Sequence, residues 1–337
     1  MKKHLCFESN EKRWNTIKRK NRMSRIVATG SYLPEKVITN TELIQQTGID
    51  SSDEWITQRT GISQRHFATA EETVSDIATQ AAKDLFKQLD QEVIDDISLI
   101  IVATMSSRLP TPSVASQVQE ALGISKAWSF DVNGACSGFI MALELAEKLS
   151  RDHSSGYTLV IGAEKMSDIL NFEDRGTSIL FGDGAGAVLI KNDGEGLLNY
   201  KSSLTSIPDP EKSIHVPSDN TSTNYMTMDG RAVFNFVLRN VIPSLSEFIT
   251  NEVGSFDYLL SHQANYRFLE IIAKKLKVSL DKIPANIKDV ANTSAGSIPI
   301  LLDELVKKDN IQLNGEQTVV FVGYGAGLAW GQISLTL

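Results

Sequence analysis

Apolar and polar positions form two kinds of segment that follow each other along the chain. Residues 97–104 are apolar nearly throughout, which is typical of a strand buried on both faces of an α/β sheet. Residues 73–89 carry apolar side chains at helical spacing and predict an amphipathic helix. By the same criteria, further strands are expected at residues 24–31, 128–132, 157–163, 187–190, 258–261, 318–322 and 328–335. Helices are expected at residues 40–46, 53–56, after Pro112, 139–149, 230–251, 265–277 and 295–307.

The remaining segments read as connections. Residues 192–228 are polar and contain three prolines, so they predict a connection with one strand near 198–206. An apolar segment lies near residues 287–290. Residues 181–186 and 323–327 are rich in glycine and are expected to be turns that allow close backbone packing.

The order of these elements repeats. Residues 131–139 read D-V-N-G-A-C-S-G-F, and residues 289–297 read D-V-A-N-T-S-A-G-S. Each stretch leads into an apolar helix, a strand, a glycine-rich turn and a further strand. We therefore expect two related α/β halves, residues 24–195 and 196–337, that face each other. Chance similarity between two α/β segments is the alternative.

Length and charge limit the possibilities. A chain of 337 residues exceeds the ~250–300 residues that a single core usually supports. The net charge of −8 argues against nucleic-acid binding. No apolar run approaches the ~18 residues that a membrane span needs. With two cysteines a disulfide framework is excluded, and a cytoplasmic protein is expected.

Residues 1–22 carry eight Lys and Arg against two Glu. This composition predicts a basic, disordered extension over residues 1–23. A basic arm for a partner and an upstream start before Met23 are alternatives.

Cys136 lies where a predicted buried strand gives way to an apolar helix. Gly134 and Gly138 flank it and allow a tight turn and a close approach. At the start of a core helix, the helix dipole favours a thiolate over a thiol. This placement predicts a nucleophile, and the alternative is a small apolar cysteine in a core.

Two other residues are placed to act with this cysteine. Of five histidines, only His262 stands at the carboxyl end of a predicted buried strand, where open α/β sheets bind ligands. Asn292 lies in the second-half turn that corresponds to the cysteine turn. If the halves are related by a pseudo-twofold axis, the three residues converge and supply a thiolate and two donors for a developing oxyanion. Taken singly, His262 could be a core histidine and Asn292 a turn residue.

Other chemistries lack their motifs. The glycine-rich segments match neither phosphate-binding nor dinucleotide-binding loops. No His, Cys, Asp and Glu cluster has metal-ligand spacing, so no metal is predicted.

Seven stretches, in order, resemble the β-ketoacyl-acyl-carrier-protein synthase III family of the thiolase superfamily. They are G-S-Y-L-P (30–34), D-E-W-I-T-Q-R-T-G-I (53–62), G-A-C-S-G-F (134–139), F-G-D-G-A-G (181–186), H-Q-A-N (262–265), N-T-S-A-G-S-I-P (292–299) and Y-G-A-G-L-A-W-G (324–331). The resemblance extends from about Met23 to the end. It implies a thiolase-like α/β fold with two pseudo-twofold-related halves in a layered αβαβα arrangement.

The resemblance also implies a reaction. An acyltransferase of this family carries out a decarboxylative Claisen condensation, which initiates type II fatty acid synthesis. Cys136 would take the acyl group from acyl-coenzyme A, and malonyl-acyl carrier protein would then lose carbon dioxide and attack the acyl-cysteine. His262 and Asn292 match the other members of the Cys-His-Asn triad, and the backbone amides of Cys136 and Ala326 would form a second oxyanion hole. Many members have glycine where Ala326 stands.

Binding residues follow from the same resemblance. Trp55 matches the adenine-stacking tryptophan, Arg59 and Arg267 match arginines at the tunnel mouth, Arg175 aligns near the nucleotide, and Asn265 matches the pantetheine-binding asparagine. The acyl-coenzyme A is a substrate, so no cofactor is expected.

The carrier protein and the primer give two further expectations. Arg267, Lys274 and Lys275 lie on one predicted helix and are expected to dock the acidic carrier protein. Thr111 occupies the position that floors the acyl pocket across the family's dimer interface, where some members carry Phe. A smaller Thr would leave room for a primer longer than acetyl, and the chain is expected to be a homodimer.

Alternatives remain open. A similar enzyme of a secondary-metabolite or ketone-forming pathway would keep the chemistry. A non-catalytic homologue that only binds carrier protein belongs to a different class. Thiolases need a second active-site cysteine late in the chain, and chain-elongating synthases need a second histidine after His262; the sequence has neither.

Overall fold

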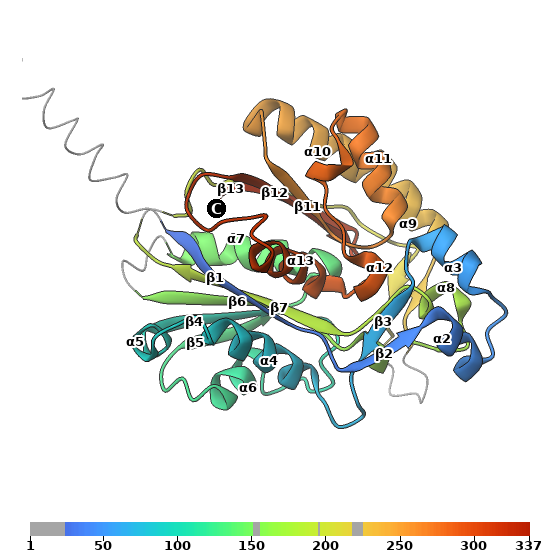
Figure 1. Cartoon of the computed structure of the whole chain (residues 1–337), viewed down its shortest axis with the longest axis horizontal. Helices are drawn as coiled ribbons and strands as arrows, with labels where there is room; N and C mark the ends of the chain where they lie inside the picture. Colours follow the sequence, from blue (N-terminus) through green and yellow to red (C-terminus); the bar gives the residue numbers. More distant parts are fainter. Residues whose placement is uncertain (1–23, 151–155, 195, 218–224) are drawn as a thin grey trace, which may run out of the picture.

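Two mixed β-sheets form the framework of the molecule (Figure 1). The computed structural model describes residues 24–150, 156–194, 196–217 and 225–337, so the extension predicted over residues 1–23 lies outside the described residues. The first sheet has the order β1 (Arg25–Tyr32), β7 (Gly184–Lys191), β6 (Tyr157–Glu164), β4 (Ile97–Ala103) and β5 (Trp128–Val132). The second has the order β11 (Tyr258–Ser261), β12 (Thr318–Gly325), β13 (Ala329–Thr336) and β8 (Lys201–Ser206).

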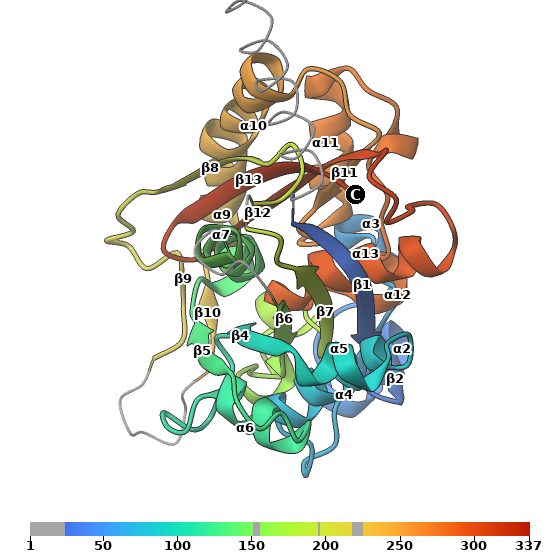
Figure 2. The same ribbon diagram turned by 90° about the vertical axis from the view of Figure 1, so that its left-hand side faces the viewer.

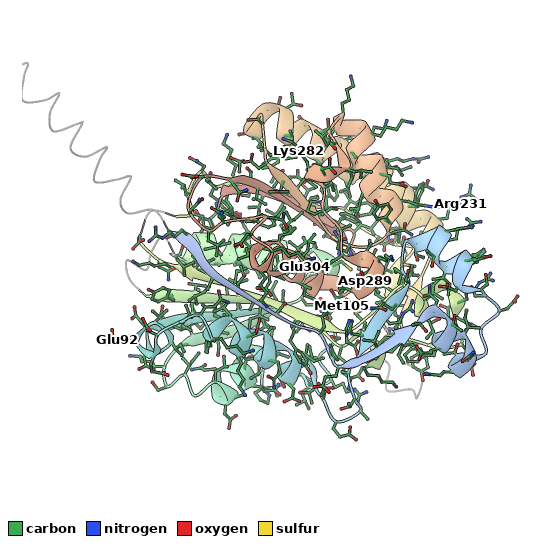
Figure 3. The ribbon with its side chains drawn as sticks, in the orientation of Figure 1. Glu92, Met105, Arg231, Lys282, Asp289 and Glu304 are labelled. Atoms are coloured by element: carbon green, nitrogen blue, oxygen red, sulfur yellow. The ribbon has the colours of Figure 1, made fainter. Side chains whose placement is uncertain are left out.

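Helices form three layers around these sheets (Figures 1 and 2). Between the sheets lie α7 (Gly138–Ser150) and α13 (Ser297–Lys307), which pack on both. The first sheet is covered on its outer face by α4 (Val74–Phe86) and α6 (Val114–Ala121). The second is covered by α9 (Gly230–Phe236), α10 (Ile242–Phe248) and α11 (Tyr266–Leu276). The side chains fill the space between the layers (Figure 3), and the predicted αβαβα arrangement is confirmed.

Four strands of the first sheet match the four strands of the second. In each sheet a parallel pair (β4 and β6, β11 and β12) is followed by two antiparallel neighbours. The turns before α7 and α13 also match, because Ala135 has φ 45° and Ser294 has φ 48°. In both turns an asparagine side chain accepts from the backbone amide two residues on, Asn133 from Ala135 at 3.4 Å and Asn292 from Ser294 at 2.8 Å. Corresponding residues of the two turns are therefore one residue further apart in the sequence than the two Asp-Val pairs.

Several local expectations need correction. The glycine-rich segments are mostly strand, since Gly184–Gly186 open β7 and Gly323–Gly325 close β12. Glycine is required there by packing between layers: a Cβ on Gly186 would lie 2.4 Å from the backbone nitrogen of Ile300 in α13. The apolar segment near 287–290, for which no element was predicted, is a short helix, α12 (Ile287–Val290), where the first half has strand β5.

Smaller elements complete the fold. The helices predicted near residues 40 and 53 are α2 (Asn40–Thr47) and α3 (Asp53–Thr60), and Thr39 caps α2 through a capping box with Glu42. Elements that the pattern did not predict are β2 (Lys36–Thr39), β3 (Gln64–Phe67), α5 (Gln91–Asp95), α8 (Arg175–Ser178), β9 (Ile214–His215) and β10 (Thr227–Met228). None of the helices in the described part of the chain has the length and hydrophobicity needed to span a bilayer.

Candidate active site

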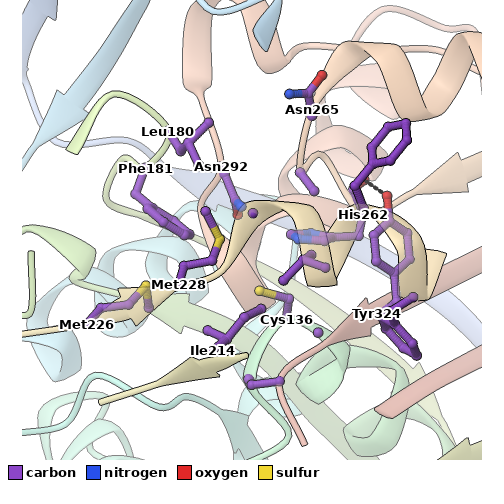
Figure 4. A pocket seen from close by; sticks show the side chains of 18 of the residues that line it. Cys136, Leu180, Phe181, Ile214, Met226, Met228, His262, Asn265, Asn292 and Tyr324 are labelled. Atoms are coloured by element: carbon purple, nitrogen blue, oxygen red, sulfur yellow. Dashed lines mark hydrogen bonds between the residues drawn. The ribbon is translucent and has the colours of Figure 1, made fainter. Parts of the chain in front are cut away.

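Cys136 lies in a 3-10 turn, Ala135–Ser137, between β5 and α7. The end of β12 packs directly behind it: a Cβ on Gly325 would lie 2.9 Å from the Cβ of Cys136 and 3.0 Å from its backbone nitrogen. Glycine therefore lets the backbone of the second half approach the cysteine. The side chain faces a pocket (Figure 4), at the start of a helix that is buried between the sheets.

His262 follows β11 directly and lies in the same pocket. Its backbone amide donates to the carbonyl oxygen of Val322 at 2.8 Å, and its ring packs edge-on against Tyr324 with centroids 5.3 Å apart. Its Nδ1 is hydrogen-bonded to Oγ of Ser297 at 2.7 Å. Burial lowers the pKa of His262 to about 3, so the imidazole is neutral at physiological pH.

Asn292 follows α12 and holds the two halves together. Its backbone amide donates to the carbonyl oxygen of Leu180 at 3.0 Å, and its own carbonyl oxygen accepts from Gly182 at 3.1 Å. Because its Oδ1 accepts from the backbone of Ser294, the Nδ2 group is the donor that this side chain offers to the pocket.

The structure thus brings Cys136, His262 and Asn292 to one pocket of about 850 Å³, counted out to its open mouth (Figure 4). They come from the carboxyl ends of elements in both halves, as the repeat predicts. The rest of the wall is largely apolar and includes Met105, Leu180, Phe181, Ile214, Met226, Met228, Val233, Phe234, Phe236 and Phe268. Such a lining suits an apolar chain more than a charged ligand.

The electrostatic state of Cys136 differs from the predicted one. Burial raises the pKa of the Cys136 thiol to about 12, and the charge of Glu164 acts in the same direction. A hydrogen bond with the side chain of Ser294 opposes this rise in pKa without cancelling it. Burial therefore acts against the thiolate that the helix start alone predicts.

Comparisons with known proteins support a family assignment. The model of 3-oxoacyl-[acyl-carrier-protein (ACP)] synthase III matches residues 130–205, and that of its C-terminal part matches residues 250–337. The beta-ketoacyl-[acyl-carrier-protein] synthase III of Streptococcus gordonii is 42% identical over 332 residues, which cover 94% of this chain and 100% of the relative. The chain belongs to the β-ketoacyl-acyl-carrier-protein synthase III family.

Solved structures of the family share the fold. The 3-oxoacyl-[acyl-carrier-protein] synthase III from Aquifex aeolicus is 36% identical with a TM-score of 0.82, over 93% of this chain and all of that chain. The priming beta-ketosynthase from the R1128 polyketide biosynthetic pathway is 30% identical with a TM-score of 0.85, over 94% and 96%. The expected thiolase-like fold is thus confirmed.

The residues expected to bind coenzyme A form one cluster, which reaches the pocket through Asn265. Trp55 of α3 is 36% exposed, and the guanidinium carbons of Arg175 and Arg59 lie 4.8 Å and 5.5 Å from the centre of its ring. Arg175 also donates to the carbonyl oxygen of Asp50 at 2.7 Å. An exposed aromatic ring with two guanidinium groups beside it supplies groups that can stack on a purine and pair with its phosphates.

Asn265 and Arg267 join this cluster through the start of α11. The side chain of Asn265 caps α11 by accepting from the amide of Arg267 at 3.0 Å, and it donates to the carbonyl oxygen of Arg59 at 3.0 Å. Arg267 reaches the carbonyl oxygen of Gln58 at 3.2 Å. Asn265 lines the pocket, but its amide is engaged in fixing α11 against α3.

The remaining expected residues lie in three different places. Ala326 lines the pocket beside Cys136, directly after β12. Lys274 and Lys275 are exposed in the last turn of α11, on the same helix as Arg267. Thr111 is exposed and is not part of the pocket wall in a single chain.

The sequence reasoning missed Ser294, Ser297 and Glu164, which all contact the triad or its partners. Both serines lie inside the quoted stretch N-T-S-A-G-S, where a polar residue in a buried turn was a usable signal. Glu164 was marked by its position, a carboxylate directly after the apolar run 157–163. Among the described residues no three His, Cys, Asp or Glu side chains are grouped so as to hold a metal ion.

Proposed function

We propose that Cys136 is the acyl-accepting nucleophile and that His262 and Asn292 stabilise the enolate in a decarboxylative condensation. As a member of its family the chain is an acyltransferase-type condensing enzyme that initiates fatty acid synthesis, acting on acyl-coenzyme A and malonyl-acyl carrier protein. The observation that supports these roles is the convergence of the three side chains on one pocket.

In the first step, Sγ of Cys136 attacks the thioester carbonyl of acyl-coenzyme A. The carbonyl oxygen becomes an oxyanion next to the backbone amides of Cys136 and Ala326. These amides are fixed hydrogen-bond donors and stabilise the oxyanion without reorganisation. The C–S bond to coenzyme A then breaks, and its thiol leaves. A new thioester on Cys136 conserves the activated acyl group.

In the second step, the malonyl thioester loses its carboxylate as carbon dioxide. The electron pair moves to the thioester oxygen, which accepts hydrogen bonds from His262 and Asn292. A neutral imidazole can donate from Nε2 while its Nδ1 is held by Ser297. The enolate carbon then attacks the acyl-cysteine, and Cys136 leaves as a thiolate that regains a proton.

Intact-mass spectrometry tests this assignment. The protein is exposed to a panel of acyl-coenzyme A donors, and each productive donor should add its acyl mass to the wild type and not to Cys136→Ala. Malonyl-acyl carrier protein should then discharge the acyl-enzyme to a β-ketoacyl product. Absence of acyl-enzyme with every donor would favour a non-catalytic carrier-protein-binding homologue.

A second candidate function changes the pathway and keeps the chemistry. It is favoured by the 30% identity to the priming beta-ketosynthase of a polyketide pathway. The two candidates differ in the carrier protein that they serve. Condensation with the organism's fatty-acid carrier protein supports the first, and turnover restricted to a dedicated carrier protein supports the second.

We further propose that carrier protein docks along α11, at Arg267 in its first turn and Lys274 and Lys275 in its last turn. All three are exposed on one helix, whose N-cap Asn265 lines the pocket, and an acidic partner would complement them. Lys274→Glu with Lys275→Glu should raise KM for malonyl-acyl carrier protein and spare acyl-coenzyme A. Equal effects on both substrates would contradict this docking site.

We propose a homodimer formed through the β5 edge of the first sheet. β5 ends that sheet and exposes Trp128, and Leu109, in the segment before α6, is 54% exposed. Thr111 is exposed in that same segment and does not line the pocket of a single chain, so its role in an acyl pocket needs a second copy of the chain. Trp128→Glu should yield monomers by light scattering, and Thr111→Phe should shift donor preference toward acetyl. Faster acylation of the wild type by acetyl than by every medium-chain donor would contradict the roomy pocket.

No cofactor is proposed, because a thiol and hydrogen-bond donors suffice for both steps. The reaction needs Cys136 as a free thiol, which a reducing cytoplasm maintains. We therefore propose a cytoplasmic location.

A further inference from the structure

Arg65 is an arginine of β3 whose side chain lies wholly inside the protein. Its guanidinium group donates to two backbone carbonyl oxygens, that of Ile38 at 3.3 Å and that of Ile179 at 2.9 Å. Its Nε has no hydrogen-bond partner in the described part of the chain. Burial lowers the pKa of Arg65 to about 10, so the side chain still carries its charge at neutral pH.

A cation at this depth is costly to keep. Removing a charge from water is unfavourable unless a partner compensates it. The charge of Asp53 favours the cation, yet both guanidinium bonds go to carbonyl oxygens rather than to its carboxylate. An apolar side chain of similar length could fill the same space without that cost. The presence of an arginine is therefore best explained by what its two hydrogen bonds hold in place.

The two bonds tie α8 to the two-stranded sheet of β2 and β3. Ile38 belongs to β2 and pairs with Arg65, whereas Ile179 follows α8 directly. Arg175 begins α8, one helical turn before the carbonyl that Arg65 holds. Its guanidinium carbon lies 4.8 Å from the centre of the Trp55 ring, in the coenzyme A cluster of Trp55, Arg59 and Arg175. Arg65 therefore fixes the helix from which Arg175 reaches that ring.

Trp55 is anchored to the same two-stranded sheet. Asn40 follows β2 directly and is buried. Its side-chain amide donates to Oδ1 of Asp53 at 2.8 Å and to the carbonyl oxygen of Ile62 at 2.7 Å. Asp53 is the first residue of α3, which carries Trp55. The spacing between Trp55 and Arg175 thus depends on two buried polar side chains, Asn40 for α3 and Arg65 for α8.

The segment that follows α8 also holds Asn292. The carbonyl oxygen of Leu180 accepts from the backbone amide of Asn292 at 3.0 Å, and the amide of Gly182 donates to the carbonyl oxygen of Asn292 at 3.1 Å. These bonds begin one residue after the carbonyl that Arg65 holds. A Cβ on Gly182 would lie 3.2 Å from the Cβ of Arg65, so β3 packs closely against this segment.

We propose that Arg65 is a positioning residue for two groups, Arg175 in the coenzyme A cluster and Asn292 in the pocket. The inference rests on the proposed roles of Arg175 and Asn292. Arg175 belongs to the segment 175–182 that Arg65 fixes, and the backbone of Asn292 is bonded to that segment. Acylation of Cys136 itself should be spared, because the amides of Cys136 and Ala326 belong to other elements.

Steady-state kinetics of the full-length protein tests the proposal. Arg65→Met roughly keeps the length of the side chain and removes its donors. KM for the acyl-coenzyme A that the intact-mass panel selects should rise about tenfold, as in Arg175→Ala, and KM for the matching acyl-pantetheine, which lacks the nucleotide, should not change. At saturating malonyl-acyl carrier protein, release of carbon dioxide should slow about tenfold in Arg65→Met. It should not slow in Arg175→Ala, which leaves the backbone bonds of Asn292 in place.

Further variants separate positioning from general damage. If Arg65 acts on the nucleotide through Arg175, adding Arg65→Met to Arg175→Ala should raise KM no further, whereas independent damage would add. Arg65→Lys keeps the charge and a donor and should recover part of both losses. Thr158→Val removes a buried hydrogen bond to Asn192 near the start of β6, outside the pocket wall. This control for stability should leave KM and carbon dioxide release unchanged.

The outcomes are distinct. If Arg175→Ala keeps the wild-type KM, or Asn292→Ala keeps the wild-type decarboxylation rate, the proposed role of that residue fails. If these two variants are impaired while folded Arg65→Met and Arg65→Lys match the wild type in both measurements, the positioning role is wrong and the proposed function stands. An equal loss of acylation from acyl-pantetheine would also overturn it, because the damage would then be general. If Arg65→Met does not fold, the same measurements on Arg65→Lys decide the question.

Discussion

Ser297 decides which nitrogen of His262 carries the proton. Oγ of Ser297 accepts from the backbone amide of Gln263 at 3.4 Å, so its own proton is free to donate to Nδ1 of His262 at 2.7 Å. A neutral imidazole with an acceptor at Nδ1 holds its proton at Nε2, the nitrogen that can donate to an enolate. Ser297→Ala removes this selection and leaves Nδ1 buried without its partner.

The magnitude follows from the burial of the pair. Ser297 and His262 are 2% and 1% exposed, so water cannot readily replace the lost hydroxyl. Leaving a buried donor or acceptor unsatisfied costs ~1–3 kcal/mol. Because 1.36 kcal/mol is a factor of ten in rate, decarboxylation should slow by about five- to 150-fold. The pKa of about 3 for His262 means that this loss should not vary between neutral and mildly acidic pH.

The assay is release of carbon dioxide from malonyl-acyl carrier protein, with acylation of Cys136 measured in parallel. Ser297→Ala should slow decarboxylation much more than acylation, because the hydroxyl contacts His262 and not the thiol. Thr79→Ala, which removes a buried hydroxyl from α4 on the outer layer, controls for stability. Equal loss in both half-reactions, or decarboxylation unchanged from wild type, would refute the reasoning.

Three more outcomes are expected. Trp55→Ala should raise KM for acyl-coenzyme A about tenfold or more through loss of stacking, and should spare acyl-pantetheine, which lacks the nucleotide; an equal rise for both would count against it. Gly325→Ala places a Cβ 2.9 Å from that of Cys136, so thermal unfolding should show ~1–3 kcal/mol of destabilisation and acylation should fall; a fully active, stable variant would contradict this contact. The raised pKa of Glu164 means that the folded state binds its proton more tightly than the unfolded state, so wild-type stability is lost as pH rises from about 4.5 to about 7. Relative to wild type, Glu164→Gln should therefore gain up to about 3 kcal/mol between these pH values in urea unfolding, and a pH-independent difference would rule out the shift.

Local sequence patterns predicted the helices and strands well where contacts within one half of the chain determine them. The apolar runs and helical spacings gave the strands and helices of both sheets, and the repeated turn gave the relation between the halves. The glycine-rich segments were predicted to be turns but are largely strand, because their glycines are required by close packing between layers. Gly186 faces the backbone of α13, about a hundred residues away, and no local pattern contains that contact.

The protonation of Cys136 also depends on contacts that a local sequence pattern does not contain. The start of α7 favours a thiolate, and that argument uses only the residues around Cys136. The groups that oppose it come from elsewhere in the chain: Glu164 ends β6, and the apolar wall of the pocket draws on both halves. Where a helix dipole and burial oppose each other, desolvation is the larger effect on the pKa of a buried group, up to several pKa units against a fraction of that.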